Sequence, residues 1–125
     1  MGRQTLGKPT GASYSAGVVV PDGRLVFISG TVAMDDNGDV IAPGDMEAQS
    51  RHIFARISEL LEEAGAGLDN IVKITTFVTD MSKYAGFSKV RGEVFGSDYP
   101  ASATVGVSTL VKPELLVEVE AIAVV

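Results

Sequence analysis

Two glutamates near the C-terminus are the carboxylates best placed to do chemistry in this chain. Glu118 and Glu120 alternate with apolar residues in the segment LVEVEAIAVV. In a β-strand they would point to one face, about 7 Å apart, and Ile122 and Val124 would continue that face. A strand face that changes from charged to apolar residues is consistent with a carboxylate that lies in a cleft. The same spacing fits a strand end at the solvent edge, so both interpretations stay open at this point.

The remaining reactive side chains are few. The chain has no cysteine, which excludes thiolate nucleophiles and cysteine metal sites. Its single histidine, His52, is not placed to serve in Ser-His-Asp catalysis. His52 falls next to Arg51 and four residues before Arg56, on what would be the polar face of a helix, so we expect it to be exposed. Any chemistry must therefore use carboxylates, hydroxyls and backbone amides.

An acidic segment tests the alternative of a metal site. Asp35, Asn37 and Asp39 are spaced like the first ligands of a calcium loop. Such a loop needs glycine at its sixth position and glutamate at its twelfth, where this chain has Val40 and Met46. The segment is better explained as a solvated hairpin turn at Asn37-Gly38, and we expect no metal and no cofactor.

Length, charge and hydropathy limit the class of protein. A chain of 125 residues fits one domain, residues 1–125. The net charge of −6, with no local cluster of basic residues, argues against nucleic acid as a partner. No apolar run reaches membrane-spanning length and the N-terminus has no signal-peptide core. The expected location is the cytoplasm, with no membrane partner.

Hydrophobic periodicity predicts two helices. Residues 46–64 repeat apolar side chains at three- and four-residue spacing, and Gly65 follows as a stop. A second helix is predicted over residues 83–95, capped by Asp80 or Ser82.

The strands are predicted from β-branched runs and turn residues. Residues 1–13 lack periodicity and suggest an extended arm. Residues 18–20 and 25–29 are predicted to form a hairpin across Pro21-Asp22-Gly23. Further strands are predicted at residues 71–79, 103–110 and 115–124.

This element order favours an α+β fold in which both helices pack on one face of a mixed sheet. In a monomer of this size, the apolar runs at residues 26–28 and 122–125 would leave the sheet face without helices hydrophobic and exposed to solvent. We therefore expect the sheets of several subunits to pack together.

Six segments in this order resemble the RidA/YjgF family, also called L-PSP endoribonuclease-like proteins. They are YS (14–15), LVFISG (25–30), DNIVK (69–73), FVTD (77–80), YPA (99–101) and VEVEAIA (117–123). The resemblance covers nearly the whole chain. It implies an α+β protomer of the bacillus chorismate mutase type, assembled as a homotrimer whose sheets face a central barrel, with a ligand cleft between each pair of subunits.

The resemblance also implies an activity and its residues. Well-studied members hydrolyse enamines and imines such as 2-aminoacrylate, releasing ammonia and a 2-keto acid. Carried over by position, Glu118 would orient the attacking water, with Glu120 as its neighbour. Tyr14, Ser29 and Gly30 match the family's substrate-binding positions.

Three positions depart from the family pattern. Ser102 stands where active members carry an arginine that binds the substrate carboxylate with two hydrogen bonds; Ser88 replaces an asparagine, and Thr104 a position often held by cysteine. Loss of the guanidinium should weaken binding of a 2-imino acid at least about tenfold. We therefore expect a different ligand, larger or uncharged. Arg91 could supply a replacement charge, but a helix arginine of this kind is expected to be exposed.

Three functions follow as hypotheses. The first is a RidA-like hydrolytic deaminase of reactive enamine or imine intermediates with an altered substrate. The alternative is a non-catalytic trimer that binds a small molecule in the same cleft. Endoribonuclease activity is the weakest, because the chain is acidic, has no basic groove and has no positioned histidine.

Overall fold

A computed structural model describes residues 3–20 and 22–125. The two predicted helices are present. Helix α1 is Met46–Glu63, and the Asp45 side chain caps it by accepting a hydrogen bond from the Ala48 backbone N–H. Helix α2 is Tyr84–Phe95 and follows the short 3-10 helix η2, Met81–Lys83, which Asp80 caps. A second 3-10 helix, η1 (Leu68–Asn70), leads into strand β4.

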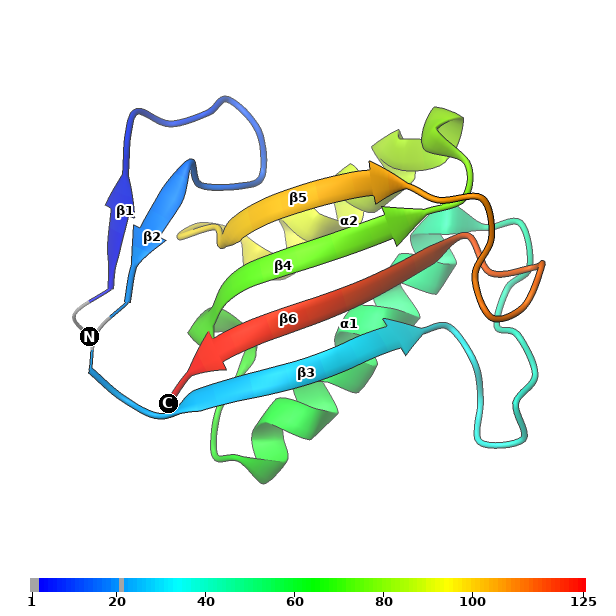
Figure 1. Cartoon of the computed structure of the whole chain (residues 1–125), viewed down its shortest axis with the longest axis horizontal. Helices are drawn as coiled ribbons and strands as arrows, with labels where there is room; N and C mark the ends of the chain where they lie inside the picture. Colours follow the sequence, from blue (N-terminus) through cyan, green and yellow to red (C-terminus); the bar gives the residue numbers. More distant parts are fainter. Residues whose placement is uncertain (1–2, 21) are drawn as a thin grey trace.

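Four strands form the main sheet in the order β3-β6-β4-β5. They are β3 (Leu25–Val32), β6 (Val117–Val124), β4 (Ile71–Val78) and β5 (Ala101–Gly106). Strand β4 pairs parallel to β5 and antiparallel to β6, and β3 pairs antiparallel to β6. The sheet is therefore mixed, and its two edge strands are β3 and β5 (Figure 1).

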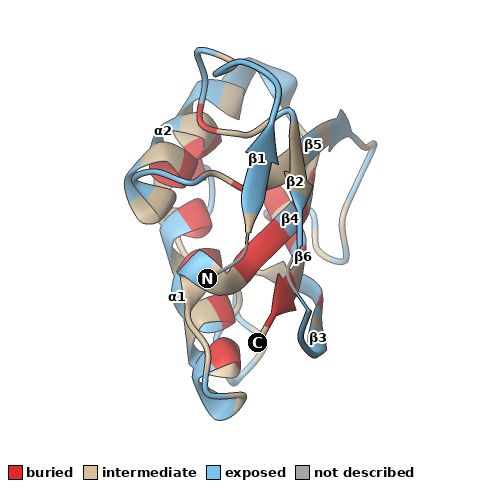
Figure 2. Ribbon diagram, turned by 90° about the vertical axis from the view of Figure 1, so that its left-hand side faces the viewer, coloured by how far each residue is buried: buried red, intermediate tan, exposed pale blue. Residues whose placement is uncertain are grey.

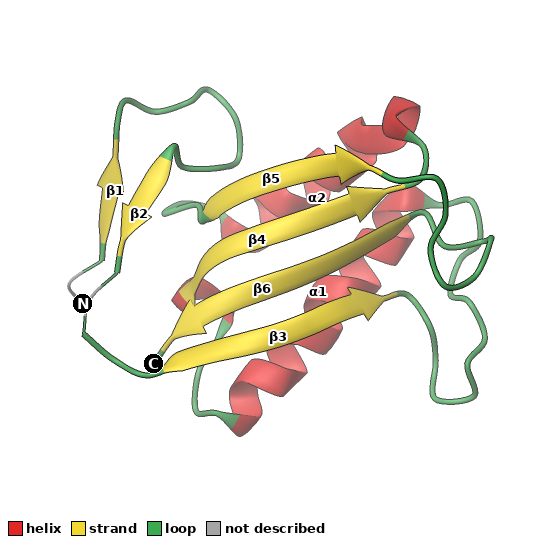
Figure 3. Ribbon diagram, viewed as in Figure 1, coloured by secondary structure: helices red, strands yellow, loops and turns green. Residues whose placement is uncertain are grey.

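Both helices cover one face of this sheet (Figure 3), as the sequence predicted. The core lies between the two layers, where the buried residues gather (Figure 2). Ile53, Phe54 and Ile57 of α1 and Phe87 and Val90 of α2 are essentially buried there. The rings of Phe54 and Phe87 stack with centroids 6.1 Å apart. No described helix is both long and apolar enough to span a bilayer.

The opposite face of the sheet carries exposed apolar side chains. Leu25 and Phe27 of β3 are 57% and 69% exposed, and Val105 of β5 is 43% exposed. Phe27 lies opposite Ile122 of β6, and Val105 lies opposite Phe77 of β4. In the single chain this apolar face is uncovered, as predicted.

The N-terminal prediction was wrong in its pairing. Strand β2 (Gly17–Val19) pairs antiparallel with β1 (Gln4–Leu6) in a separate two-stranded sheet, and β3 pairs with β6. Residues 18–20 and 25–29 therefore form no hairpin with each other, and Pro21 of the proposed turn lies outside the described residues. The predicted extended arm contains β1, for which β2 supplies backbone partners that local sequence does not reveal.

The last two predicted strands also differ in extent. Strand β5 begins two residues earlier than predicted and ends at Gly106, and β6 begins at Val117. Although they are consecutive in the chain, they are separated in the sheet by β4. Ser102 and Thr104 therefore both lie inside an edge strand.

Candidate active site

A bulge in β3 brings Gly30 against the Glu118 carboxylate. The β3–β6 register shifts between Ile28 and Thr31, so Ser29 and Gly30 lie in the irregular part of the strand. A methyl group added at Gly30 would lie 2.9 Å from the carboxyl carbon of Glu118, closer than real contacts allow. The missing side chain at Gly30 is thus what lets the carboxylate lie against the strand.

Glu118 and Glu120 share the outer face of the sheet, as the alternation predicted. Glu118 lies opposite Phe77, and Glu120 lies opposite Thr75. Glu118 is half-buried, whereas Glu120 is exposed. The more enclosed carboxylate, Glu118, is therefore the better placed of the two to orient a water molecule.

A groove of about 900 Å³ runs between β3 and α1, and Glu118, on the outer face of the sheet, does not line it. Ser29 and Gly30 line it from β3, and His52 and Arg56 line it from α1. His52 was expected to be exposed. It is half-buried, with Nε2 3.2 Å from the carbonyl oxygen of Met34.

The other candidate residues gather at the β5 edge. A cavity of about 280 Å³ is lined by six residues, which are Tyr14, Met81, Tyr84, Arg91, Ser102 and Thr104. Tyr14 is brought there by its neighbour Ser15, whose backbone N–H donates to the carbonyl of Pro100 at 3.0 Å and which bridges to Ala101 at the start of β5. Three predicted binding residues, Tyr14, Ser102 and Thr104, thus share one cavity.

Arg91 is buried in this cavity wall, which corrects the prediction that it is exposed. It is only 2% exposed. Its Nε donates to Ser13 Oγ at 2.9 Å and its Nη1 donates to Ser102 Oγ at 3.1 Å. Its Nη2 donates to the Tyr84 hydroxyl at 2.9 Å. The guanidinium of α2 therefore contacts Ser102 of β5, where the sequence resemblance predicted an arginine in active members.

Ser88 does not line either cavity. The Ser88 carbonyl oxygen accepts a hydrogen bond from Ser13 Oγ at 3.3 Å, and Ser13 in turn accepts from Arg91. Ser88 thus supports the guanidinium through its backbone. Its side chain keeps the predicted binding role only as a prediction.

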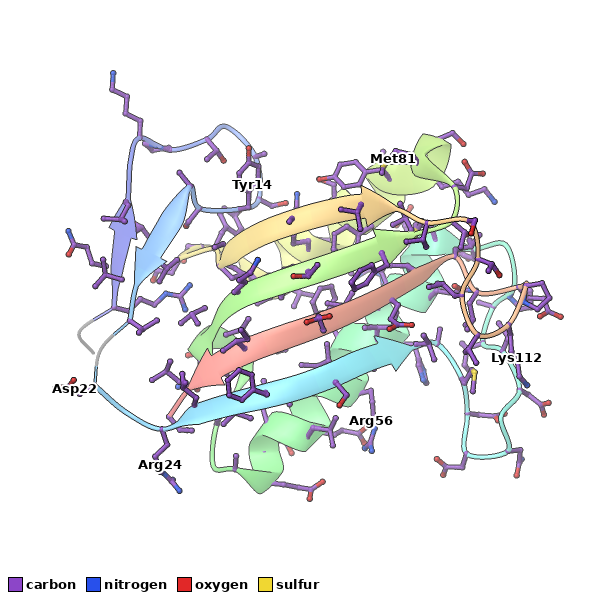
Figure 4. The ribbon with its side chains drawn as sticks, viewed as in Figure 1. Tyr14, Asp22, Arg24, Arg56, Met81 and Lys112 are labelled. Carbon is purple, nitrogen blue, oxygen red and sulfur yellow. The ribbon has the colours of Figure 1, made fainter. Side chains whose placement is uncertain are left out.

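Within one chain the two groups of residues do not meet. Ser102 and Thr104 pair with Ile74 and Thr76, whose side chains are buried beneath the helices, whereas Glu118 pairs with Phe77 of the outer face. Figure 4 shows how the two groups are separated across the strands of the sheet. Tyr14 and Met81 lie by β5, and Arg56 lies on α1 beyond β3. The candidate residues therefore fall into two groups, near opposite edges and on opposite faces of the sheet.

The rim of the β5 cavity is fixed by a capped turn. Asp80 Oδ1 accepts hydrogen bonds from the hydroxyl and the backbone N–H of Ser82, which lower the pKa of Asp80. The turn carries Met81 to the cavity. Across the described residues, no three His, Cys, Asp or Glu side chains are grouped to hold a metal ion.

Sequence reasoning missed Ser13, Tyr84 and Met81 as part of this cavity. A signal for Arg91 was present, since it follows Tyr84 by seven residues and Phe87 by four, the spacing of one helix face. That face is the buried face of α2. A charged residue on a buried stripe indicates a partner or a ligand.

Comparison with known proteins identifies the family. The family model described as endoribonuclease L-PSP matches residues 6–125. A RutC family protein of Pyrococcus abyssi is 38% identical over 116 residues, covering 93% of this chain and 88% of that protein. The chain belongs to the RidA/YjgF family.

Solved structures of the family have the same fold. The Rid family protein YyfB of Yersinia pestis superposes with a TM-score of 0.90 at 31% identity, over 100% of both chains. RidA of a Psychrobacter species superposes with a TM-score of 0.75 at 30% identity, over 97% of this chain and 93% of that one. The family's sheet and helices are thus reproduced here.

Proposed function

We propose that this protein is a RidA-like hydrolytic deaminase of reactive enamine or imine intermediates, releasing ammonia and a carbonyl product. The observation that carries the proposal is the Glu118 carboxylate held half-buried against the side-chain-free Gly30. Membership of the RidA/YjgF family supports the reaction class.

The proposal includes a homotrimer with three clefts between subunits. One edge of the chain carries Glu118 and Gly30, and the other carries Tyr14, Arg91 and Ser102. A head-to-tail association of these opposite edges forms a ring when its rotation closes, and we propose closure after three subunits. The exposed Leu25, Phe27 and Val105 would be covered where the sheets face the central barrel.

The reaction needs one base that can carry a proton back and forth. The enamine tautomerises to an imine, whose carbon is electrophilic. The Glu118 carboxylate accepts a proton from water as the water oxygen bonds to that carbon and the C=N π bond breaks onto nitrogen, and it then passes this proton to the nitrogen to give a carbinolamine. The Glu118 carboxylate next accepts the hydroxyl proton and passes it to the amino nitrogen, so that the C=O bond forms as the C–N bond breaks and ammonia leaves. One imine and one water thus give one carbonyl compound and one ammonia.

In this scheme Ser29 and Gly30 position the Glu118 carboxylate, which is the base. Their bulge lies against the Glu118 carboxylate, and the exposed Ser29 also lines the groove between β3 and α1. The attacking water would bind on the outer face of the sheet, between the carboxylate and a ligand held by the neighbouring subunit. Because the substrate is anchored by the other half-site, its identity depends on the residues around Ser102.

The direct test is hydrolysis of imines generated in situ by an amino-acid oxidase, beginning with 2-iminopropanoate and extending to longer side chains. The protein is expected to accelerate imine decay and ammonia release for at least one imine. Glu118→Gln should lower that rate by about 10²- to 10⁴-fold, the usual contribution of a general base. Glu62→Gln, an exposed glutamate at the end of α1, is the matched control and should keep full activity.

Two outcomes would count against the proposal. Decay of every imine unchanged by the protein would favour the non-catalytic binding trimer. Full activity in Glu118→Gln would remove the role given to that residue.

A further inference from the structure

The most unusual group outside the proposed base is the buried charge of Arg91. Its side chain is 2% exposed, and burying a cation is costly unless an anion or several acceptors compensate it. Among residues 3–20 and 22–125 the ion pairs involve Arg51, Arg56 and Lys89, and Arg91 has no carboxylate partner. The cavity wall therefore holds a positive charge that no described carboxylate neutralises.

Neutral groups hold this charge in a fixed orientation. Ser13, Ser102 and Tyr84 each accept one hydrogen bond from it. The rings of Tyr14, Tyr84 and Phe87 lie 5.7, 5.8 and 5.4 Å from the guanidinium carbon, a favourable distance for cation–π contact. The guanidinium is thus positioned before any ligand arrives, which lowers the ordering cost of binding.

Part of its hydrogen-bonding capacity is still free. A guanidinium has five N–H groups, and one on each of Nε, Nη1 and Nη2 donates to a neighbour. One N–H on Nη1 and one on Nη2 have no acceptor within the described parts of the chain. Two N–H groups on the terminal nitrogens suit the two oxygens of a carboxylate.

The cavity around Arg91 has the composition of an anion site. Of the six residues that line it, Arg91 alone is charged, and Tyr14, Tyr84, Ser102 and Thr104 carry hydroxyls. Its volume of about 280 Å³ accommodates part of a small ligand. The small Ser102 side chain leaves space on β5 that an arginine there would fill, and its hydroxyl accepts from Arg91.

We propose that Arg91, reaching β5 from helix α2, is the anion-binding residue of this site, and that the substrate carries a carboxylate bound there. This inference rests on the proposed function for the reacting end of the substrate. It differs from the expectation of a larger or uncharged ligand, because it takes the positive charge absent at position 102 to be supplied from the helix. A carboxylate held by Arg91 directs the C=N carbon toward Glu118 of the neighbouring subunit in the proposed trimer.

Binding, which needs no turnover, tests this inference separately from the reaction. Each 2-oxo acid from pyruvate to 2-oxohexanoate is titrated into the wild-type protein by calorimetry, alongside its uncharged amide. We expect at least one acid to bind about tenfold or more tightly than its amide. In ¹⁵N-arginine-labelled protein, that acid should shift the Arg91 Nε–H resonance.

Two variants distinguish an effect of the Arg91 charge on binding from an effect of the protein's net charge. Arg91→Gln should remove the preference for the acid and leave amide binding unchanged. Arg51→Gln, which removes an exposed arginine paired with Glu93, is the matched control and should keep the preference. Should Arg91→Gln fail to fold, the wild-type acid–amide comparison and the labelled resonance still decide the matter.

The inference is overturned if no acid is preferred over its amide in the wild type, absence of binding included. It is also overturned if folded Arg91→Gln keeps the preference. Acid binding through Arg91 without hydrolysis of any imine would instead contradict the proposed function and leave the anion site standing.

Discussion

At the scale of single residues, small side chains position the two charged groups of the proposed site. Gly30 leaves room for the Glu118 carboxylate, and Ser102 leaves room for the Arg91 guanidinium and accepts a hydrogen bond from it. In both places a larger residue would displace the charge. The geometry of the proposed site therefore depends on the small side chains at positions 30 and 102 as much as on the charged residues themselves.

Gly30→Ala tests the first of these positions. The added methyl would lie 2.9 Å from the Glu118 carboxyl carbon, so the carboxylate must move away from the strand. A displacement of about 1 Å at a reacting group costs on the order of 10²-fold in rate. We expect a loss of imine hydrolysis of about that size, measured as kcat/KM, with the fold retained by circular dichroism.

A glycine outside both half-sites provides the comparison. Gly67→Ala places its methyl 3.2 Å from Asp69 Oδ1, the end of a flexible side chain that can move aside. It should keep wild-type kcat/KM. Undiminished activity in Gly30→Ala would show that the close approach to Glu118 has no catalytic role.

The sequence identified most of these residues but not the environment of Arg91. Alternation along β6 placed Glu118 and Glu120 on one face, because strand periodicity is a local property. The burial of Arg91 is not local. It depends on Ser13 and Ser102, which come from an N-terminal loop and an edge strand.

At the scale of elements, a buried glutamine links helix α1 to the strand that carries Glu118. Gln49 is fully buried. Its Nε2 donates to the Glu114 carbonyl at 3.1 Å, and its Oε1 accepts from the Leu116 backbone N–H at 2.8 Å. These bonds hold the chain just before β6 and so fix where that strand begins.

Gln49→Leu should therefore destabilise the protein. The Leu116 N–H and the Glu114 carbonyl would lose their partner in these part-buried hydrogen bonds, and a polar group left unsatisfied away from water costs about 1–3 kcal/mol. We expect a loss of roughly 2 kcal/mol or more in the free energy of unfolding, measured by urea titration at fixed protein concentration. Gln4→Leu on the exposed strand β1 should change it little, and equal effects of the two substitutions would refute the role of Gln49.

The helices and the central strands were predictable because their signals are local. The predicted helix 46–64 corresponds to Met46–Glu63, and the predicted strand 71–79 corresponds to Ile71–Val78. Strand pairing was harder to predict from the sequence. Turn residues near Gly23 favoured a hairpin, yet the partner of β3 is β6, which lies at the far end of the chain. Pairing between distant segments depends on the whole core and leaves no local signal.

At the scale of the whole molecule, the arrangement has one half-site at each edge of the sheet. The Glu118 half lies by β3, and the Arg91 half lies by β5. Under the proposed function, a complete cleft needs two chains. The proposed homotrimer would supply three such junctions and would cover the exposed apolar face around Phe27.

The most direct test of this shared cleft is complementation between two inactive variants. Glu118→Gln damages one half-site and Arg91→Gln damages the other. The two variants are co-expressed with different tags, and the mixed trimers are isolated through both tags. In a ring of three, one junction then joins an intact Glu118 half to an intact Arg91 half. The mixed trimers should therefore recover about one-third of wild-type imine hydrolysis. Mixed trimers no more active than the separate variants would contradict a cleft shared between chains.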